Sequence, residues 1–275
     1  MLSTNEIMID RLTEEVRAIY KRDYGLLNPE YPNIACWAVR MAIENIRNSD
    51  ALYHNVEHTA FVLEVGLRII SGRQIRDGDV TPHDWLMYTV ALAFHDIGYV
   101  RGACAGDRPG VYMTGIGDEC VVLGSTVTDA SMSPYHVDRA KMFIRDRFAG
   151  NALLDVEQIC RNIEHTRFPV PEGEDYACNR DFPGLVRAAD LIGQLADPRY
   201  LMKLPALFYE FYETGAHKKL GYKNPDDVRR RYPVFFWNTV RPYITEALEY
   251  LRLTEAGYQW VANLHSVIFD AQQER

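Results

Sequence analysis

The sequence is poor in the features that mark secreted, membrane or nucleic-acid-binding proteins. Its net charge of −8 over 275 residues argues against a nucleic-acid polymer as partner, because such proteins usually present a basic face. No apolar run reaches the length of a membrane span, and residues 1–6 show neither the basic nor the apolar region of a signal peptide. The five cysteines include no CxxC pair, which favours reduced thiols over a disulfide framework. We therefore expect a cytoplasmic protein that contacts neither a membrane nor a nucleic-acid polymer.

Helical periodicity dominates the chain, and no segment alternates convincingly between apolar and polar residues as a strand would. A capping box of Ser3 and Glu6 opens the first helix, and Thr81-Pro82-His83-Asp84 supplies the start of another. Without a linker or repeat, the chain is expected to form one all-α domain over 1–275, with a site-bearing core at about 33–197 and a helical extension at about 198–275. The predicted helices lie at about 3–22, 33–48, 55–71, 82–94, 117–129, 135–148, 151–164, 183–195 and 199–214, followed by helices after Asn224 and Thr254.

Six histidine and aspartate side chains occur in an order that suits two metal ions inside a helical bundle. The helix at about 82–94 is apolar almost all round and ends at His95-Asp96, so a polar pair follows the most buried element and needs partners. His54 and His58 are four residues apart, which on a helix places both imidazoles on one face. His58 can then bind metal while His54 stays free to pass a proton. The predicted ligands are His58, His95, Asp96, His136, His165 and Asp190.

These residues resemble the HD-domain superfamily of metal-dependent phosphohydrolases, which is named for a His-Asp doublet. The family pattern is a histidine on one helix, the doublet at the end of the next and a later aspartate in an apolar helix, and His58, His95-Asp96 and Asp190 match it. The segment Tyr53-His54-Asn55-Val56-Glu57-His58 is similar to the motif of the cyclic nucleotide phosphodiesterases. The resemblance covers about 53–190 and implies that His54 is the general acid and His58 a metal ligand.

The mixed donor set also narrows the choice of metal. Imidazole and carboxylate ligands suit Mn, Fe, Co, Ni or Zn better than Ca, which prefers an all-oxygen shell. The expected cofactors are two divalent transition-metal ions bridged by the catalytic carboxylate of Asp96, with a shared hydroxide as the nucleophile. The leaving oxygen needs a proton, which His54 can supply. The expected function is hydrolysis of a small phosphorylated substrate, a nucleotide or cyclic nucleotide; the sequence does not determine the oligomeric state.

Two alternative functions remain open from the sequence. His136 and His165 go beyond the ligands of the simplest phosphodiesterases and resemble the binuclear branches of the superfamily, the HD-GYP cyclic dinucleotide phosphodiesterases and the inositol oxygenase group. The HD-GYP motif itself is missing, which argues against a cyclic dinucleotide as substrate. The first alternative is a di-iron HD-domain oxygenase, because the resemblance to that group includes the ligand order of its di-iron sites. The second alternative is a nucleotide-binding sensor that holds its ligand without turnover.

Basic and glycine-rich segments near the predicted ligands suggest how a substrate is held. A guanidinium suits a phosphate, although an ion pair on a solvated helix is its commoner role. The stretch at about 98–117 is rich in glycine and is expected to be a long loop, either a lid over the site or a passive insertion. The candidate phosphate-binding residues are Arg101, Arg139 and Arg167.

Overall fold

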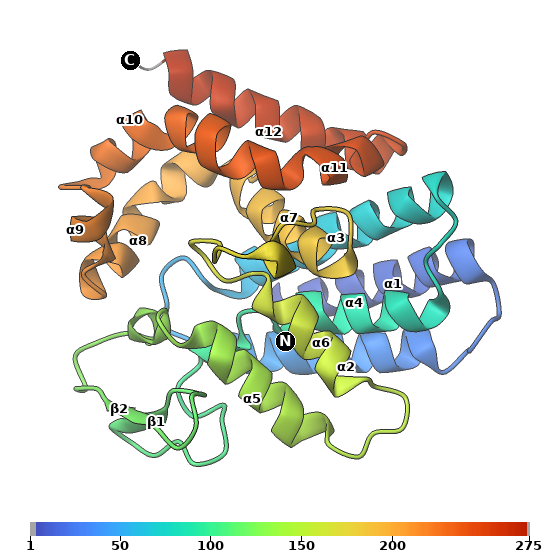
Figure 1. Ribbon diagram of the computed structural model, residues 1–275, viewed down its shortest axis with the longest axis horizontal. Coiled ribbons are helices and arrows are strands. Elements are labelled where there is room, and N and C mark those ends of the chain that lie inside the picture. Colours follow the sequence, from blue (N-terminus) through green and yellow to red (C-terminus); the bar gives the residue numbers. More distant parts are fainter. Residues whose placement is uncertain (1–3, 274–275) are drawn as a thin grey trace.

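The computed structural model describes residues 4–273 and confirms the all-α fold class (Figure 1). Across 4–273, no helix is both long and apolar enough to span a bilayer. Short 3₁₀ turns lie at Ile97–Tyr99, Asp129–Met132 and Glu174–Tyr176, and a π-helical turn at Phe236–Val240. The helices are α1 (Thr4–Tyr24), α2 (Tyr31–Ile46), α3 (Val56–Arg76), α4 (Pro82–Phe94), α5 (His136–Phe148), α6 (Val156–Glu164), α7 (Phe182–Leu195), α8 (Tyr200–Glu213), α9 (Ala216–Leu220), α10 (Pro225–Phe235), α11 (Arg241–Leu251) and α12 (Glu255–Gln273).

Helix α4 is the central element of the bundle. Its residues from Trp85 to Phe94 are all buried, and α2, α3, α6 and α7 pack around it. The predicted cap is present: Thr81 Oγ1 accepts a hydrogen bond from the Asp84 N–H at 3.1 Å, and the Asp84 carboxylate accepts one from the Thr81 N–H at 3.4 Å. Because α4 is buried on every side, the polar pair that follows it is placed in the interior of the fold.

The helices after residue 198 cover one end of this bundle. In Figure 1, α8 to α12 (orange to red) form a layer next to α3 and α7, and α11 packs on both of those helices. Helix α8 is also tied to the core by the carboxylate of Glu213, which accepts hydrogen bonds from Thr128 N at 2.8 Å and Thr128 Oγ1 at 2.9 Å. The C-terminal helices therefore belong to the surroundings of the predicted site.

The prediction of a helix at 117–129 is wrong. The strands Val111–Met113 (β1) and Cys120–Val122 (β2) pair antiparallel instead, with Val111 opposite Val122. Gly115 and Gly117 in the connection have φ of 80° and 52°, a conformation that glycine adopts without the steric cost paid by other residues. The predicted cap at Ser3 lies outside the described residues.

A buried arginine holds the glycine-rich loop in place through hydrogen bonds and an ion pair. The Arg139 guanidinium is fully buried and donates hydrogen bonds to Gly98 O at 2.6 Å, Val100 O at 2.9 Å and Asp107 Oδ2 at 2.9 Å. Asp107 also accepts a hydrogen bond from the Met113 N–H at 2.8 Å, so the ion pair connects the start of the loop to its hairpin. This geometry argues against a freely moving lid, and it corrects the prediction that Arg139 binds substrate.

The Asp107→Ala variant is expected to lose about 3–5 kcal/mol of unfolding free energy, because the Arg139 guanidinium would stay buried without its counter-charge. Urea and thermal unfolding measure the effect. The matched control is Asp118→Ala, which removes an exposed carboxylate from the same loop and is expected to change stability by less than about 0.5 kcal/mol. Equal unfolding midpoints for the two variants would show that the ion pair does not anchor the loop.

Candidate metal centre

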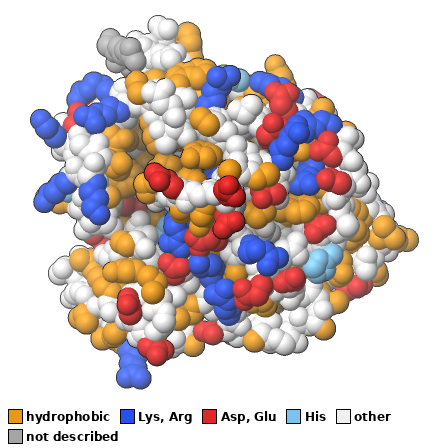
Figure 2. Space-filling view, in the orientation of Figure 1, with side chains coloured by type: hydrophobic (Ala, Val, Ile, Leu, Met, Phe, Trp, Pro, Cys, Tyr) orange, Lys and Arg blue, Asp and Glu red, His pale blue; other side chains and the backbone are white. Residues whose placement is uncertain are grey.

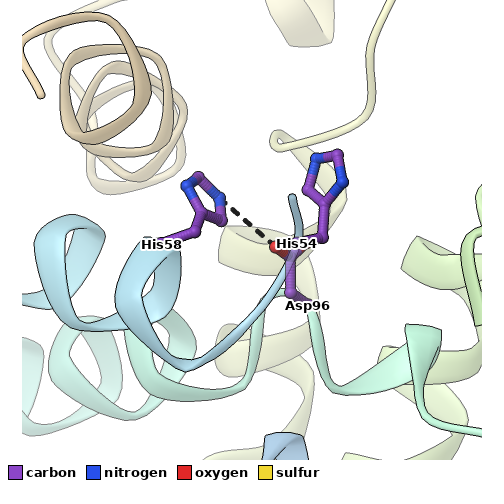
Figure 3. A group of neighbouring side chains, drawn as sticks. All are labelled: His54, His58 and Asp96. Atoms are coloured by element: carbon purple, nitrogen blue, oxygen red, sulfur yellow. Dashed lines mark ion pairs between the residues drawn. The ribbon is translucent and has the colours of Figure 1, made fainter. Parts of the chain in front are cut away.

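Four side chains from three parts of the bundle converge beyond the end of α4. His58 lies in the first turn of α3, His95 and Asp96 follow α4, and Asp190 lies within α7. Nε2 of His58 is 3.3 Å from Asp96 Oδ2 and 3.2 Å from Asp190 Oδ1. Nε2 of His95 is 3.3 Å and 3.7 Å from the same two oxygens, and 3.5 Å from Nε2 of His58. Figure 3 shows how His58 and Asp96 face each other.

These separations suit a metal ion. Ligand atoms about 3.4 Å apart surround a tetrahedral ion at bond lengths of about 2.1 Å, which is the usual range for zinc with nitrogen and oxygen ligands. Among the described residues, Asp96 Oδ2 is one of the buried side-chain atoms without a hydrogen bond, which is costly unless another group satisfies it. The structure therefore brings together histidine and aspartate groups that can hold a metal ion.

Hydrogen bonding and charge prepare these donors for a cation. His95 Nδ1 donates to Leu92 O at 2.8 Å, which leaves the Nε2 lone pair directed at the cluster. Burial disfavours the charged imidazole of His58, but the adjacent carboxylates of Asp190 and Asp96 outweigh burial and raise its pKa to about 10. The two carboxylates thus favour a positive charge between them, and a metal ion supplies that charge as well as a proton does.

His54 adjoins the cluster. The spacing predicts that His54 and His58 share a helix, and this prediction is wrong. Helix α3 begins at Val56, and Asn55 is its N-cap, with Oδ1 accepting a hydrogen bond from the Glu57 N–H at 3.0 Å. His54 therefore belongs to the segment that leads into α3, as Figure 3 shows. The His54 and His58 ring centroids are nevertheless 5.4 Å apart, and together with Asp96 they form a second group that could hold a metal ion.

Glu210 of α8 sets the orientation of His54. Glu210 Oε2 accepts a hydrogen bond from His54 Nδ1 at 2.5 Å, and Oε1 accepts one from the Tyr53 N–H at 2.6 Å. Burial disfavours the charged imidazole of His54, but the charge and hydrogen bond of Glu210 outweigh it and raise the pKa. Glu210 was not among the residues predicted from the sequence. Its carboxylate within the apolar run 204–212 was a signal, because a buried charge needs a partner.

His136 lies outside the cluster but lines a cavity into which the cluster opens. The Tyr99 ring is stacked between two histidines, with its centroid 4.6 Å from His54 and 4.6 Å from His136. His136 Nδ1 donates to Ser133 O at 2.6 Å, and burial lowers the pKa of the imidazole in spite of the nearby Asp96 charge. His136 therefore presents an uncharged imidazole to the cavity near neutral pH.

His165 is not brought to the cluster. Its ring stacks on Tyr176 with 4.9 Å between centroids, and burial together with the charge of Arg187 lowers its pKa. The neighbouring Thr166 lines the cavity, whereas His165 does not. Of the six predicted ligands, the structure gathers four and leaves His136 and His165 apart.

Arg101 and Arg167 are engaged in ion pairs with carboxylates of their own chain. Arg101 Nε donates to Asp129 Oδ1 at 2.5 Å, and Arg167 Nε donates to Glu164 Oε1 at 2.6 Å. Neither residue lines the cavity beside the cluster, and neither does Arg139. The prediction that these arginines hold a substrate phosphate is therefore corrected, because their donors face intramolecular partners.

The cluster opens into a cavity of about 160 Å³ that lies between the core and the C-terminal helices. Its polar end includes His54, Asp96, His136 and Asp190. Figure 2 shows a hollow with hydrophobic side chains beside α8 to α10 and with basic side chains on its outer edge. Aromatic residues that were not predicted from the sequence line the far end: Phe168, Tyr200, Phe211, Tyr222, Tyr232 and Phe235.

Comparison with known proteins identifies a family but names no chemistry. No curated protein matches the chain. A family model described as Npun_R2479-like matches residues 2–274, which is nearly the whole sequence. The chain belongs to the Npun_R2479-like family.

Proposed function

We propose that this chain is a metal-dependent phosphoester hydrolase that acts on a small phosphodiester of the nucleotide or cyclic nucleotide type. One observation carries the proposal: groups that can hold a metal ion and a histidine oriented by a glutamate border the same cavity. A single substrate can therefore meet both groups. The resemblance of His58, His95-Asp96 and Asp190 to the HD-domain phosphohydrolases supports the same chemistry.

His58, His95, Asp96 and Asp190 would hold a divalent ion of Mn, Fe, Co, Ni or Zn. Bound there, such ions would supply an ionised water near neutral pH and positive charge to stabilise the phosphoryl oxygens. A second ion would share Asp96 as a ligand. It would have fewer protein ligands than the sequence predicts, because His136 and His165 lie outside the cluster. We therefore expect one tightly held ion and a second, more weakly held one.

The residues of the chain account for the proton that the reaction requires. In phosphodiester hydrolysis, a water oxygen bonds to phosphorus, the bond from phosphorus to the leaving oxygen breaks, and the leaving oxygen takes up a proton. His54 Nδ1 is bound to Glu210, so Nε2 is the position that can carry this proton. Tyr99 stacks against the His54 ring and limits its rotation, which keeps the Glu210 contact in place.

Removal and restoration of metal tests the proposal. Protein treated with chelator and dialysed is expected to lose hydrolysis of bis(p-nitrophenyl) phosphate by at least about a thousandfold, and Mn, Co, Ni or Zn is expected to restore it. Element analysis of protein purified without nickel affinity should find one ion retained through dialysis. Full turnover by metal-free protein would contradict the proposal.

The same preparation distinguishes the two alternatives. Bound iron with consumption of dioxygen would replace the hydrolase by the di-iron oxygenase, and tight nucleotide binding without product would indicate a sensor. The pairing of His54 with Glu210 favours hydrolysis, because neither alternative needs a proton donor beside the metal ligands.

A further inference from the structure

The cavity beside the metal-binding cluster has two chemically different ends. The polar end carries the histidines and aspartates of the cluster, and the other end is built from α8, α9, α10 and the segment after α6. Phe168 packs edge-to-face on Phe235 with 5.8 Å between centroids, and Phe211 stacks on Tyr222 at 6.3 Å. These four rings, together with Tyr200 and Tyr232, line the far end, which we call the aromatic chamber.

No lysine or arginine is among the residues that line this cavity, all of which lie in the described part of the chain. Arg231 contacts two lining residues from outside: it is exposed, donates to Leu220 O at 3.1 Å and lies 5.6 Å from the Tyr222 ring centroid. A phosphate group in the chamber would thus lose its hydration without gaining a cationic partner, which is costly. The chamber therefore disfavours a charged substituent.

Tyr232 contributes a buried aromatic ring to the wall of the chamber. Tyr232 is 2% exposed, and its hydroxyl has no hydrogen-bond partner within residues 4–273. The aromatic rings of the chamber suit a largely apolar ligand.

We infer that the aromatic chamber binds an uncharged aromatic ester group, so the preferred substrate is a singly charged phosphodiester and not a nucleoside polyphosphate. The inference rests on the proposed function, because it places the reacting phosphate at the metal-binding cluster. The inference narrows the substrate class by charge. The substrate has one phosphate, which lies at the cluster, and the group that lies in the chamber is uncharged.

Two pairs of substrates with a common leaving group test this specificity in the metal-loaded protein. Bis(p-nitrophenyl) phosphate and methyl p-nitrophenyl phosphate have the same charge and differ in whether the retained ester group is aromatic. The p-nitrophenyl esters of thymidine 5′-monophosphate and of the γ-phosphate of thymidine 5′-triphosphate differ in charge. We expect kcat/KM for the monophosphate ester to exceed that for the triphosphate ester by at least about tenfold. A preference for the triphosphate ester would overturn the inference.

The Phe235→Ala variant separates specificity from general damage. It is expected to lower kcat/KM for the bis-aryl ester by about tenfold and for the methyl ester by less than about twofold. Phe269→Ala removes an exposed phenylalanine from α12 and should change neither value. Arg231→Gln should leave the ratio of the two thymidine esters unchanged. The chamber's role would be contradicted if Phe235→Ala lowered kcat/KM equally for the bis-aryl and methyl esters. It would also be contradicted if Arg231→Gln lowered kcat/KM for the triphosphate ester alone.

A binding measurement keeps this inference separate from the proposed function. Calorimetry with metal-free protein should show diphenyl phosphate binding at least about tenfold more tightly than dimethyl phosphate, with the difference reduced in Phe235→Ala. If the protein shows this binding preference but no turnover, the proposed hydrolase function is rejected and the inferred binding of an aromatic group in the chamber stands. Turnover without the preference, in binding or in kcat/KM, would reject the chamber alone.

Discussion

Replacing Asp96 with alanine is expected to abolish both metal retention and phosphoester hydrolysis. Asp96 Oδ2 lies 3.3 Å from Nε2 of both His58 and His95, so this carboxylate contacts both imidazoles of the cluster. Its removal takes away one ligand and one negative charge from a buried site. Loss of the metal's contribution to the transition state corresponds to about 4 kcal/mol or more, a decrease of at least about a thousandfold in kcat/KM.

Element analysis after dialysis and initial-rate kinetics on bis(p-nitrophenyl) phosphate measure the two effects of Asp96→Ala. The control is Asp118→Ala, which removes the same chemical group from an exposed position and should retain both metal and activity. Circular dichroism establishes that the Asp96→Ala variant is folded. A folded variant with normal metal content and turnover would rule out this site as the catalytic centre.

Replacing His54 with alanine is expected to leave the tightly bound metal in place and to slow hydrolysis in a way that depends on the leaving group. A p-nitrophenolate leaves without a proton, whereas an alkoxide needs one in the transition state. The loss of kcat should therefore reach about a hundredfold to ten-thousandfold for an alkyl ester such as a dinucleoside monophosphate and should be much smaller for a p-nitrophenyl ester. Comparison of kcat for both substrates measures this difference.

Glu210→Gln is expected to slow hydrolysis less than His54→Ala does. Glutamine keeps the size of the side chain but removes the charge that favours the imidazolium form of His54, so a smaller loss on the same alkyl ester is expected. Metal content should be unchanged, because Glu210 belongs to neither group that could hold the ion. If His54→Ala hydrolyses both kinds of ester with equal losses, His54 does not donate the proton.

Local patterns predicted most of the helices, and their failures have local causes. Thr81 and Asp84 cap α4 as expected, because a capping box acts within one turn. The pattern of residues 117–129 predicts a helix, but glycines at positive φ reverse the chain and form the β1–β2 hairpin. The pair His54 and His58 had helical spacing, yet Asn55 is the N-cap of α3 and leaves His54 outside the helix. Periodicity identifies a helix more reliably than the residue at which it begins.

The sequence by itself determined the all-α class and the residues His58, His95, Asp96 and Asp190, which the fold then brought together. Both follow from information along the chain, namely apolar periodicity and polar residues placed at buried positions. Only the tertiary structure paired His54 with Glu210 across 156 positions, buried Arg139 under the loop and left His165 apart from the cluster. Distances between remote side chains depend on how helices pack, and no spacing within the sequence encodes them directly.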